Sequence, residues 1–230
     1  MSDVNEVSRI IQGALLPQAA PRIEGYQVAA GTTREESGRG ASVWDWFGFA
    51  DGRTALLTLD VRQDGLPPAH HLGVARAVFR ALASAHSSVP ELLAHTNEVM
   101  AASRVGTAAQ FVEVGLLVVG AEEVEWASAG QVPGGIIRRN GMFEEFGAHG
   151  PPLGMMGGFK YTTQHIAMGA GDTAFVLSHG SHGLFLGAAD LVAQLHGKPA
   201  GEIVSTLHRA IRKAMEDEAT ESSVLYAMHH

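Results

Sequence analysis

The sequence predicts an α+β fold with largely antiparallel β-sheets packed against α-helices. Apolar residues make up 46% of the 230 residues, which is enough for a sizeable core. Strand-like and helical segments occur in blocks, and the turn signals Asp51-Gly52 and Asn140-Gly141 separate neighbouring strand-like runs. No linker-like stretch interrupts these blocks. We therefore expect one domain over residues 1–230, with residues 1–17 forming a helix that leads into it.

The first half of the chain predicts a helix, three strands and two helices. Apolar residues recur at spacings of three and four before Pro17, as in an amphipathic helix. Pro67 and Pro68 suit the first turn of a later helix, and Pro90 precedes another. In order, the expected elements are a helix over 4–16, strands over 26–30, 42–47 and 54–61, and helices over 69–85 and 91–103.

The second half returns to strands, then helices, then a last strand. Its strand-like runs are short, rich in β-branched and aromatic residues, and bounded by Gly, Asn and Asp. The expected strands cover residues 111–119, 123–129, 135–139, 161–168, 172–177 and 223–228, and the expected helices cover residues 184–195 and 201–216.

Charge and composition exclude several classes of function. Sixteen Lys and Arg residues against twenty-four Asp and Glu residues give a net charge of −8, which disfavours nucleic acid as a partner. The absence of cysteine excludes disulfides and thiolate metal sites. The first twelve residues lack the pattern of a signal peptide, and the longest apolar run, residues 114–120, is too short to cross a bilayer. We expect a cytoplasmic protein without membrane contact.

Several short motifs, in order along nearly the whole chain, resemble the SpoIIE-type branch of the PPM (protein phosphatase 2C-like) phosphatases. They are Gly-Ala-Ser-Val-Trp-Asp-Trp at 40–46, Asp-Val at 60–61, Asn-Glu at 97–98, Ala-Ser-Ala-Gly-Gln-Val-Pro at 127–133, Gly-Pro-Pro-Leu-Gly at 150–154, and Gly-Ala-Gly-Asp at 169–172 with Leu-Ser-His-Gly at 177–180. The resemblance implies a PPM-type β-sandwich of two antiparallel sheets flanked by α-helices.

The resemblance also implies a site in which two Mg²⁺ or Mn²⁺ ions activate water for attack on phosphoserine or phosphothreonine. Asp60 matches one of the family's metal ligands. Ser42 and His179 stand where the family has aspartates, and Gln63 stands where a glycine carbonyl helps to bind the metal. Glu221 matches the family's second C-terminal aspartate. We expect Ser42, Asp60, His179 and Glu221 to converge on one cleft at the sheet edge.

Losing two carboxylates should prevent the site from holding a pair of Mg²⁺ ions, because hard cations depend on anionic oxygen ligands. We expect either no ion or a single Mn²⁺ or Zn²⁺, since His179 suits transition metals. His70 or His182 is a further candidate ligand. The alternative interpretation is that these histidines belong to an exposed loop.

Three hypotheses of function follow. The first is a weak or inactive pseudophosphatase that acts by contact with a protein, either a phosphoprotein or an anti-sigma antagonist, in bacterial partner-switching or stress signalling. The second is an active metal-dependent Ser/Thr phosphatase that uses His179 and Glu221 as replacement ligands. The third is a small-molecule sensor on the same fold. The sequence leaves the oligomeric state open.

Overall fold

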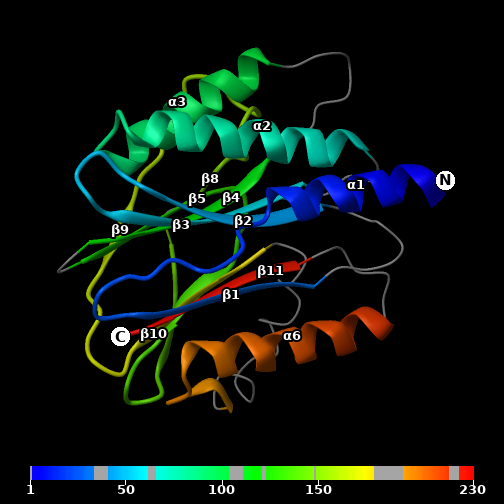
Figure 1. Ribbon diagram of the computed structural model, residues 1–230. Coiled ribbons are helices and arrows are strands. Elements are labelled where there is room, and N and C mark those ends of the chain that lie inside the picture. The colour runs from blue at the N-terminus through cyan, green and yellow to red at the C-terminus, as the bar shows by residue number, and fades with distance from the viewer. Residues whose placement is uncertain are drawn as a thin grey trace.

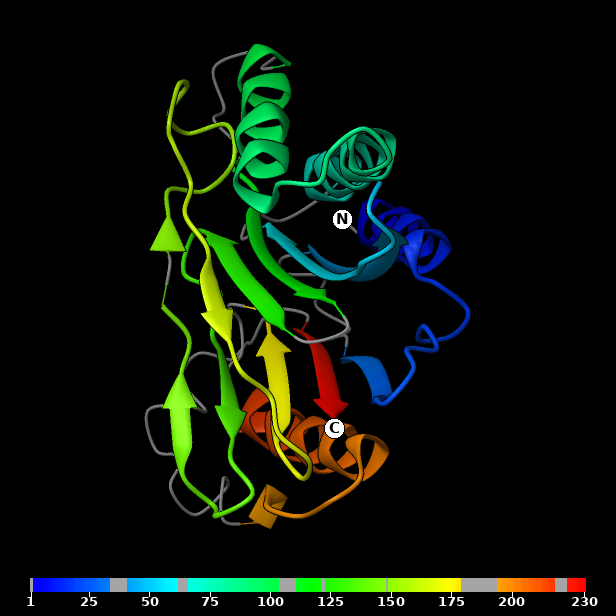
Figure 2. The ribbon, with the colours of Figure 1, turned by 90° about the vertical axis from the view of Figure 1, so that its left-hand side faces the viewer.

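Two β-sheets stack face to face between two layers of helices (Figure 1). The computed structural model describes residues 2–33, 41–61, 66–103, 111–120, 123–147, 149–178, 194–217 and 223–230. Seen from the side, helices lie outside each sheet, and the inner faces of the sheets meet in the middle (Figure 2). The structure therefore confirms the predicted α+β sandwich.

The lower sheet in Figure 1 has five strands in the order β1-β11-β10-β6-β7, and all of its neighbours are antiparallel. β11 lies between β1 and β10, so the last strand of the chain completes a sheet that the first strand began. The strands are β1 (Gln27–Thr33), β6 (Gly134–Ile137), β7 (Phe143–Glu145), β10 (Thr173–Leu177) and β11 (Ser223–His229).

The upper sheet has six strands, with the order β2-β3-β4-β5-β8 and β9 paired to β5. Its pairs are antiparallel except β5 with β8, which is parallel. The strands are β2 (Ala41–Gly48), β3 (Thr54–Val61), β4 (Glu113–Val119), β5 (Val124–Ala129), β8 (His149–Gly150) and β9 (Gln164–Ile166).

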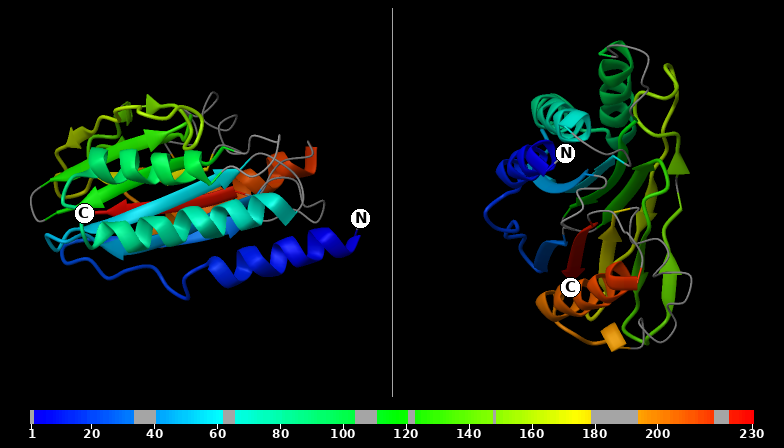
Figure 3. Two further views of the ribbon diagram at one scale, coloured as in Figure 1. Left: turned by 90° about the horizontal axis from the view of Figure 1, so that it is seen from above. Right: turned by 90° about the vertical axis from the view of Figure 1, so that its right-hand side faces the viewer.

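Helices α1 (Ser2–Leu15), α2 (Leu66–Ala83) and α3 (Val89–Ala102) cover the upper sheet, and α6 (Ala200–Asp217) covers the lower one. α1 and α2 lie side by side, as the view from above shows (Figure 3). The Ser88 side chain caps α3 by accepting a hydrogen bond from the Glu91 N–H. Within the described residues, no helix is both long enough and apolar enough to cross a membrane.

Side chains along the strands of the upper sheet alternate between its two faces, so they pack into separate hydrophobic clusters on the two sides of the sheet. Leu57 and Leu59 belong to the cluster that packs under α2 and α3. Leu56 belongs to the cluster between the two sheets, together with Trp126 and Val176. Because successive side chains of a strand point to opposite faces, the even-numbered residues of β3 face the other sheet.

The structure departs from the sequence prediction in the second half of the chain. The strand expected over 161–168 is limited to Gln164–Ile166, and Tyr161 is instead buried with its hydroxyl donating to the Pro151 carbonyl at 2.9 Å. β7 and β8 were not predicted, because strands of three and two residues show no measurable alternation. The helix expected over 184–195 lies mostly outside the described residues.

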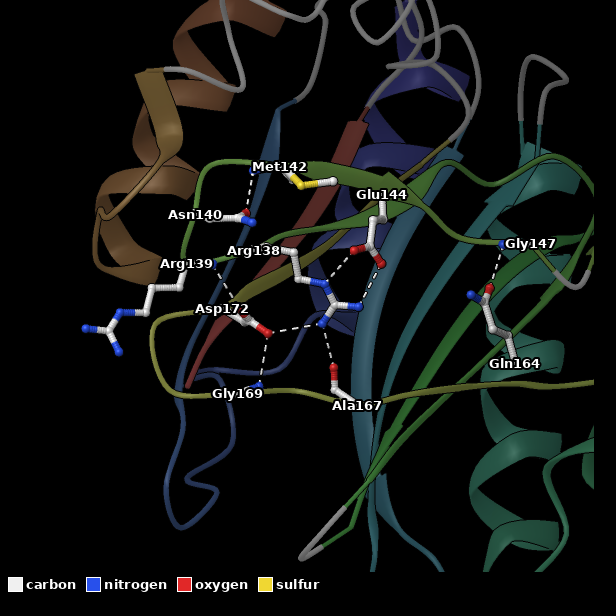
Figure 4. A network of polar contacts seen from close by, with 10 residues as sticks. All are labelled: Arg138, Arg139, Asn140, Met142, Glu144, Gly147, Gln164, Ala167, Gly169 and Asp172. Carbon is white, nitrogen blue, oxygen red and sulfur yellow. Dashed lines mark hydrogen bonds and ion pairs between the residues drawn. The ribbon is translucent and has the colours of Figure 1, made fainter.

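A network of hydrogen bonds and ion pairs joins the β6–β7 hairpin to Asp172, the residue before β10, in the lower sheet (Figure 4). Arg138 donates to both carboxylate oxygens of Glu144, at 2.8 and 2.7 Å, and to Asp172 at 3.1 Å. The hydrogen bond from Arg138 holds the pKa of Glu144 below its usual value. Burial alone would raise the pKa of Asp172, but hydrogen bonds from the N–H groups of Gly169 and Arg139 and from Arg138 outweigh burial and lower it.

Candidate functional site

Three polar residues form a row across neighbouring strands at one end of the upper sheet. Ser42 on β2 lies directly opposite Asp60 on β3, and Asp60 lies directly opposite Glu113 on β4. These residues are 0%, 1% and 8% exposed, respectively. Side chains opposed in this way have Cβ atoms roughly 4.5–5.5 Å apart and share one face. We call Ser42, Asp60 and Glu113 the polar row; it faces the space between the two sheets.

The structure brings together two of the residues that the sequence singled out, Ser42 and Asp60. Gln63, His179, Glu221 and His182 lie outside the described residues, so their convergence on this site stays a prediction. The nearest described neighbours of His179 and Glu221 are Ser178, which follows β10, and Ser223, which begins β11. β10 and β11 pair side by side, with Leu177 opposite Leu225.

His70 lies elsewhere. It is exposed on α2 and lines an apolar hollow of about 640 Å³ together with Ile11 of α1 and Val74 of α2. This hollow lies on the helical side of the upper sheet, whereas the polar row faces the lower sheet. We therefore correct the expectation that His70 is a candidate ligand beside Asp60.

Glu113 is the residue that the sequence analysis missed. It is the first residue of β4 and the only charged residue in the apolar run over 111–119. A single carboxylate at an inward-facing position of a buried strand is itself a signal, because charged residues are rarely buried without a role. Its place beside Asp60 depends on the pairing of residues that are far apart in the sequence.

A cavity of about 550 Å³ opens beside the polar row. Its described lining includes Val61, Glu113, Gly130, Gln131 and His149. Gly130 has φ +87°, and a Cβ atom at this residue would lie 2.6 Å from the Cγ atom of Glu113. Only glycine fits here without displacing Glu113.

A histidine on the rim of this cavity is held in place by a serine. The Oγ atom of Ser128, on β5, lies 2.6 Å from the Nδ1 atom of His149, on β8. Ser128 is buried, and His149 is exposed. Contact at Nδ1 fixes the ring orientation and leaves Nε2 as the second nitrogen available for hydrogen bonding. Carboxylate, amide and imidazole groups therefore line one cavity with apolar walls.

Asp45 occupies the opposite face of β2 and has a different environment. Its two oxygens accept hydrogen bonds from Nε and Nη2 of Arg80, each at 2.6 Å, and Nε of Arg76 lies 2.8 Å away. Both arginines belong to α2, and the Asp45 side chain is fully buried. This aspartate ties α2 to the sheet and is not part of the polar row.

A protein-family model matches more than half of the sequence. The family model described as "Stage II sporulation protein E (SpoIIE)" matches residues 50–182. None of the curated proteins compared is similar enough in sequence to count as a relative.

Three solved structures illustrate the likeness in fold. The SiaA-PP2C domain of Pseudomonas aeruginosa has a TM-score of 0.77 and 18% identity, over 99% of this chain and 95% of that one. The RsbU and RsbW domains of Rv1364c from Mycobacterium tuberculosis have a TM-score of 0.74 and 21% identity, over 92% of this chain and 63% of that one. The PP2C phosphatase domain of SpoIIE from Bacillus subtilis was solved with a fragment of its regulatory domain. It has a TM-score of 0.70 and 12% identity, over 89% of this chain and 63% of that one.

The chain thus spans less than two thirds of two of these structures. Other proteins of the same fold were solved with divalent cations, PstP with two manganese ions and RsbX with magnesium. The family model covers more than half of the chain, and its matched segment includes Asp60, Glu113 and the cavity beside them. The chain belongs to the SpoIIE family and has the fold of the PPM phosphatases.

Proposed function

We propose that this chain is a SpoIIE-type PPM domain whose cleft does not hold a pair of divalent cations, and that it acts by contact with a protein partner in bacterial partner-switching or stress signalling. The observation that carries the proposal is Ser42 in register with Asp60. A neutral hydroxyl stands there where the family resemblance places a carboxylate.

The donor set of the polar row supports this proposal. Asp60 and Glu113 each offer a carboxylate, and Ser42 offers a weak neutral oxygen. Two bridged divalent ions need more anionic ligands than two carboxylates provide, because carboxylate charge offsets the cost of dehydrating Mg²⁺. The described residues fit one cation better than two.

The proposed partner is a phosphoprotein or an anti-sigma antagonist. The Mycobacterium tuberculosis neighbour contains RsbU and RsbW domains in one protein, which is a precedent for a domain of this fold joined to a second, different domain. If contact rather than catalysis is the function, binding of such a partner should persist in the Asp60→Ala variant and in the presence of a chelator. Loss of binding in both conditions would count against a contact role.

Catalysis gives the direct test. We expect the unmodified chain to show no Mg²⁺-dependent hydrolysis of a phosphoserine peptide. In the double variant that carries Ser42→Asp and His179→Asp, we expect Mg²⁺ to raise the Tm, because a ligand that binds only the folded state stabilises it. Glu145→Gln, which changes an exposed carboxylate on β7, is the matched control and should leave the response to Mg²⁺ unchanged.

Glu113 favours a second candidate function, a slow phosphatase with a single metal ion. In that case Asp60 and Glu113 would hold one Mn²⁺, with His179 and Glu221 as further ligands. Such an ion supplies Lewis-acid activation of water. The polar row would orient the ion, and the His149 ring, held by Ser128, would hydrogen-bond to the phosphoryl group or its leaving oxygen.

The two candidates differ in their response to Asp60→Ala. Mn²⁺-dependent turnover that disappears in both Asp60→Ala and Glu113→Gln supports the single-ion phosphatase. Turnover with Mg²⁺ that is robust in the unmodified chain and lost in Asp60→Ala contradicts the first proposal. Turnover that is insensitive to Asp60→Ala contradicts both.

A further inference from the structure

A second group of metal-binding side chains lies at the other end of the upper sheet from the polar row. Glu123, Glu125 and His165 each place one ligand atom within 4.8 Å of the other two. Glu125 lies opposite Val118, near the end of β4, whereas Glu113 begins that strand. This group shares no residue with the polar row or its cavity, so the inference does not depend on the proposed function.

The sheet itself brings the three side chains together. Glu123 and Glu125 are two residues apart along the chain, so an extended backbone places them on one face. His165 on β9 lies directly opposite Glu125 on β5. The Nδ1 atom of His165 is 3.2 Å from Glu123 Oε2 and 3.8 Å from Glu125 Oε1.

We propose that Glu123, Glu125 and His165 form a binding site for a divalent transition-metal ion such as Zn²⁺. One imidazole nitrogen and two carboxylate oxygens are ligands that Zn²⁺ accepts, and water completes its coordination. Imidazole favours Zn²⁺, Co²⁺ and Ni²⁺ over Mg²⁺. The side chains of His165 and Glu123 are 59% and 56% exposed, so an ion can reach them from solvent.

Arg53 is the natural competitor for this site. Its Nη1 atom lies 3.2 Å from Glu125 Oε1, and its Nε atom lies 2.8 Å from Asp51 Oδ2. The guanidinium group therefore offsets part of the negative charge that a metal ion needs. If the three residues bind a metal ion, removing this positive charge should strengthen that binding. If they only form an ion-pair cluster with Arg53, removing the charge should weaken the cluster.

A bound ion would cross-link β5 and β9. β9 has three residues and is joined to the upper sheet through three residue pairs with β5. A metal clip at Glu125 and His165 would hold this short strand and the irregular segment on either side of it. Binding to the folded state alone raises apparent stability.

The test is a calorimetric titration of the full chain with Zn²⁺. We expect His165→Ala to weaken binding by on the order of 100-fold, because it removes a ligand, and Arg53→Met to strengthen it by about two- to fivefold. His95→Ala is the matched control. His95 is another exposed histidine, its Nδ1 atom lies 2.9 Å from His86 Nε2, and its loss should leave Zn²⁺ binding unchanged.

Co²⁺ gives a second readout that reports the ligands directly. A visible absorption band should appear with the unmodified chain and with Asp60→Ala, and it should be absent in His165→Ala. Absence of Zn²⁺ binding to the unmodified chain would overturn the proposal. So would unchanged binding in His165→Ala, or loss of binding in Asp60→Ala or His95→Ala, since an ion at the polar row or at the His86–His95 pair would then explain the signal.

Discussion

Asp45 and Asp60 lie on paired strands of one sheet, but they face opposite sides of it, and the charged residues described beside them differ. Asp45 faces α2 and is bound by Arg76 and Arg80. Asp60 faces the other sheet and has a second carboxylate, Glu113, opposite it in the strand register. A buried carboxylate that is neutralised by arginines stabilises the fold, whereas two carboxylates side by side resemble the donor set of a cation site.

The largest effect should come from breaking the Asp45 ion pairs. Asp45→Asn puts a neutral amide at a fully buried position and leaves the partly exposed side chains of Arg76 and Arg80 without their anionic partner. We expect the free energy of unfolding to fall by about 3–5 kcal/mol, measured by urea denaturation. Asp51→Asn is the control, because the Asp51–Arg53 pair is partly exposed and its loss should cost less than about 1 kcal/mol. Equal losses in the two variants would show that Asp45 is not a structural tie.

A smaller loss should follow from crowding Glu113. Gly130→Ala combines a positive φ with a Cβ atom 2.6 Å from Glu113, so we expect a loss of about 3 kcal/mol. Gly141→Ala is a matched control with φ +83° and no atom nearer than 3.8 Å, and it should cost about 1 kcal/mol. The difference between the two losses of stability measures the cost of the contact with Glu113. If the two variants are equally stable, Glu113 is not held against Gly130.

Asp172 extends the comparison to the lower sheet, where it resembles Asp45 because Arg138 binds it. Arg138→Met should cost on the order of 1–2 kcal/mol near neutral pH. In the unmodified chain the pKa values of Glu144 and Asp172 are lowered, so the unfolded state takes up protons first. The stabilisation is therefore complete above the ordinary pKa values of these two carboxyl groups, 4.5 for Glu144 and 3.8 for Asp172, and is lost as the pH falls through and below them.

The stability of the Arg138→Met variant should decline less steeply below pH 5 than that of the unmodified chain, as urea denaturation across this range would show. Glu145→Gln removes an exposed neighbouring carboxylate and should keep the steeper decline. A decline of the same slope in the Arg138→Met variant and the unmodified chain would rule out the Arg138 network as a source of acid sensitivity.

The smallest effect on stability should come from Asp60→Asn. This variant keeps the shape of the side chain and removes one of two adjacent negative charges, so we expect the free energy of unfolding to change by less than about 1 kcal/mol. Denaturation of Asp60→Asn and Asp45→Asn under one set of conditions compares the two aspartates directly. A loss as large as that of Asp45→Asn would place Asp60 among the structural carboxylates.

The sequence alone predicted the fold class, most helices and strands, and the family. Periodicity and turn residues act over a few neighbouring positions, so they identify long elements such as α3 and β3 reliably. The resemblance in short motifs singled out Ser42 and Asp60, which the structure pairs. β7 and β8 escaped prediction, and the strand predicted over 161–168 is shorter in the structure, because strands of two or three residues depend on their neighbours in the sheet rather than on their own sequence.

Only the tertiary structure decided which carboxylates lie together. Residues 42, 60 and 113 meet because β2, β3 and β4 pair in one register, and a shift of one residue would turn each side chain to the other face. The same register separates Asp45 from the polar row and brings His165 opposite Glu125. Local sequence determines which segments become strands, whereas pairing over long separations determines what their side chains can bind.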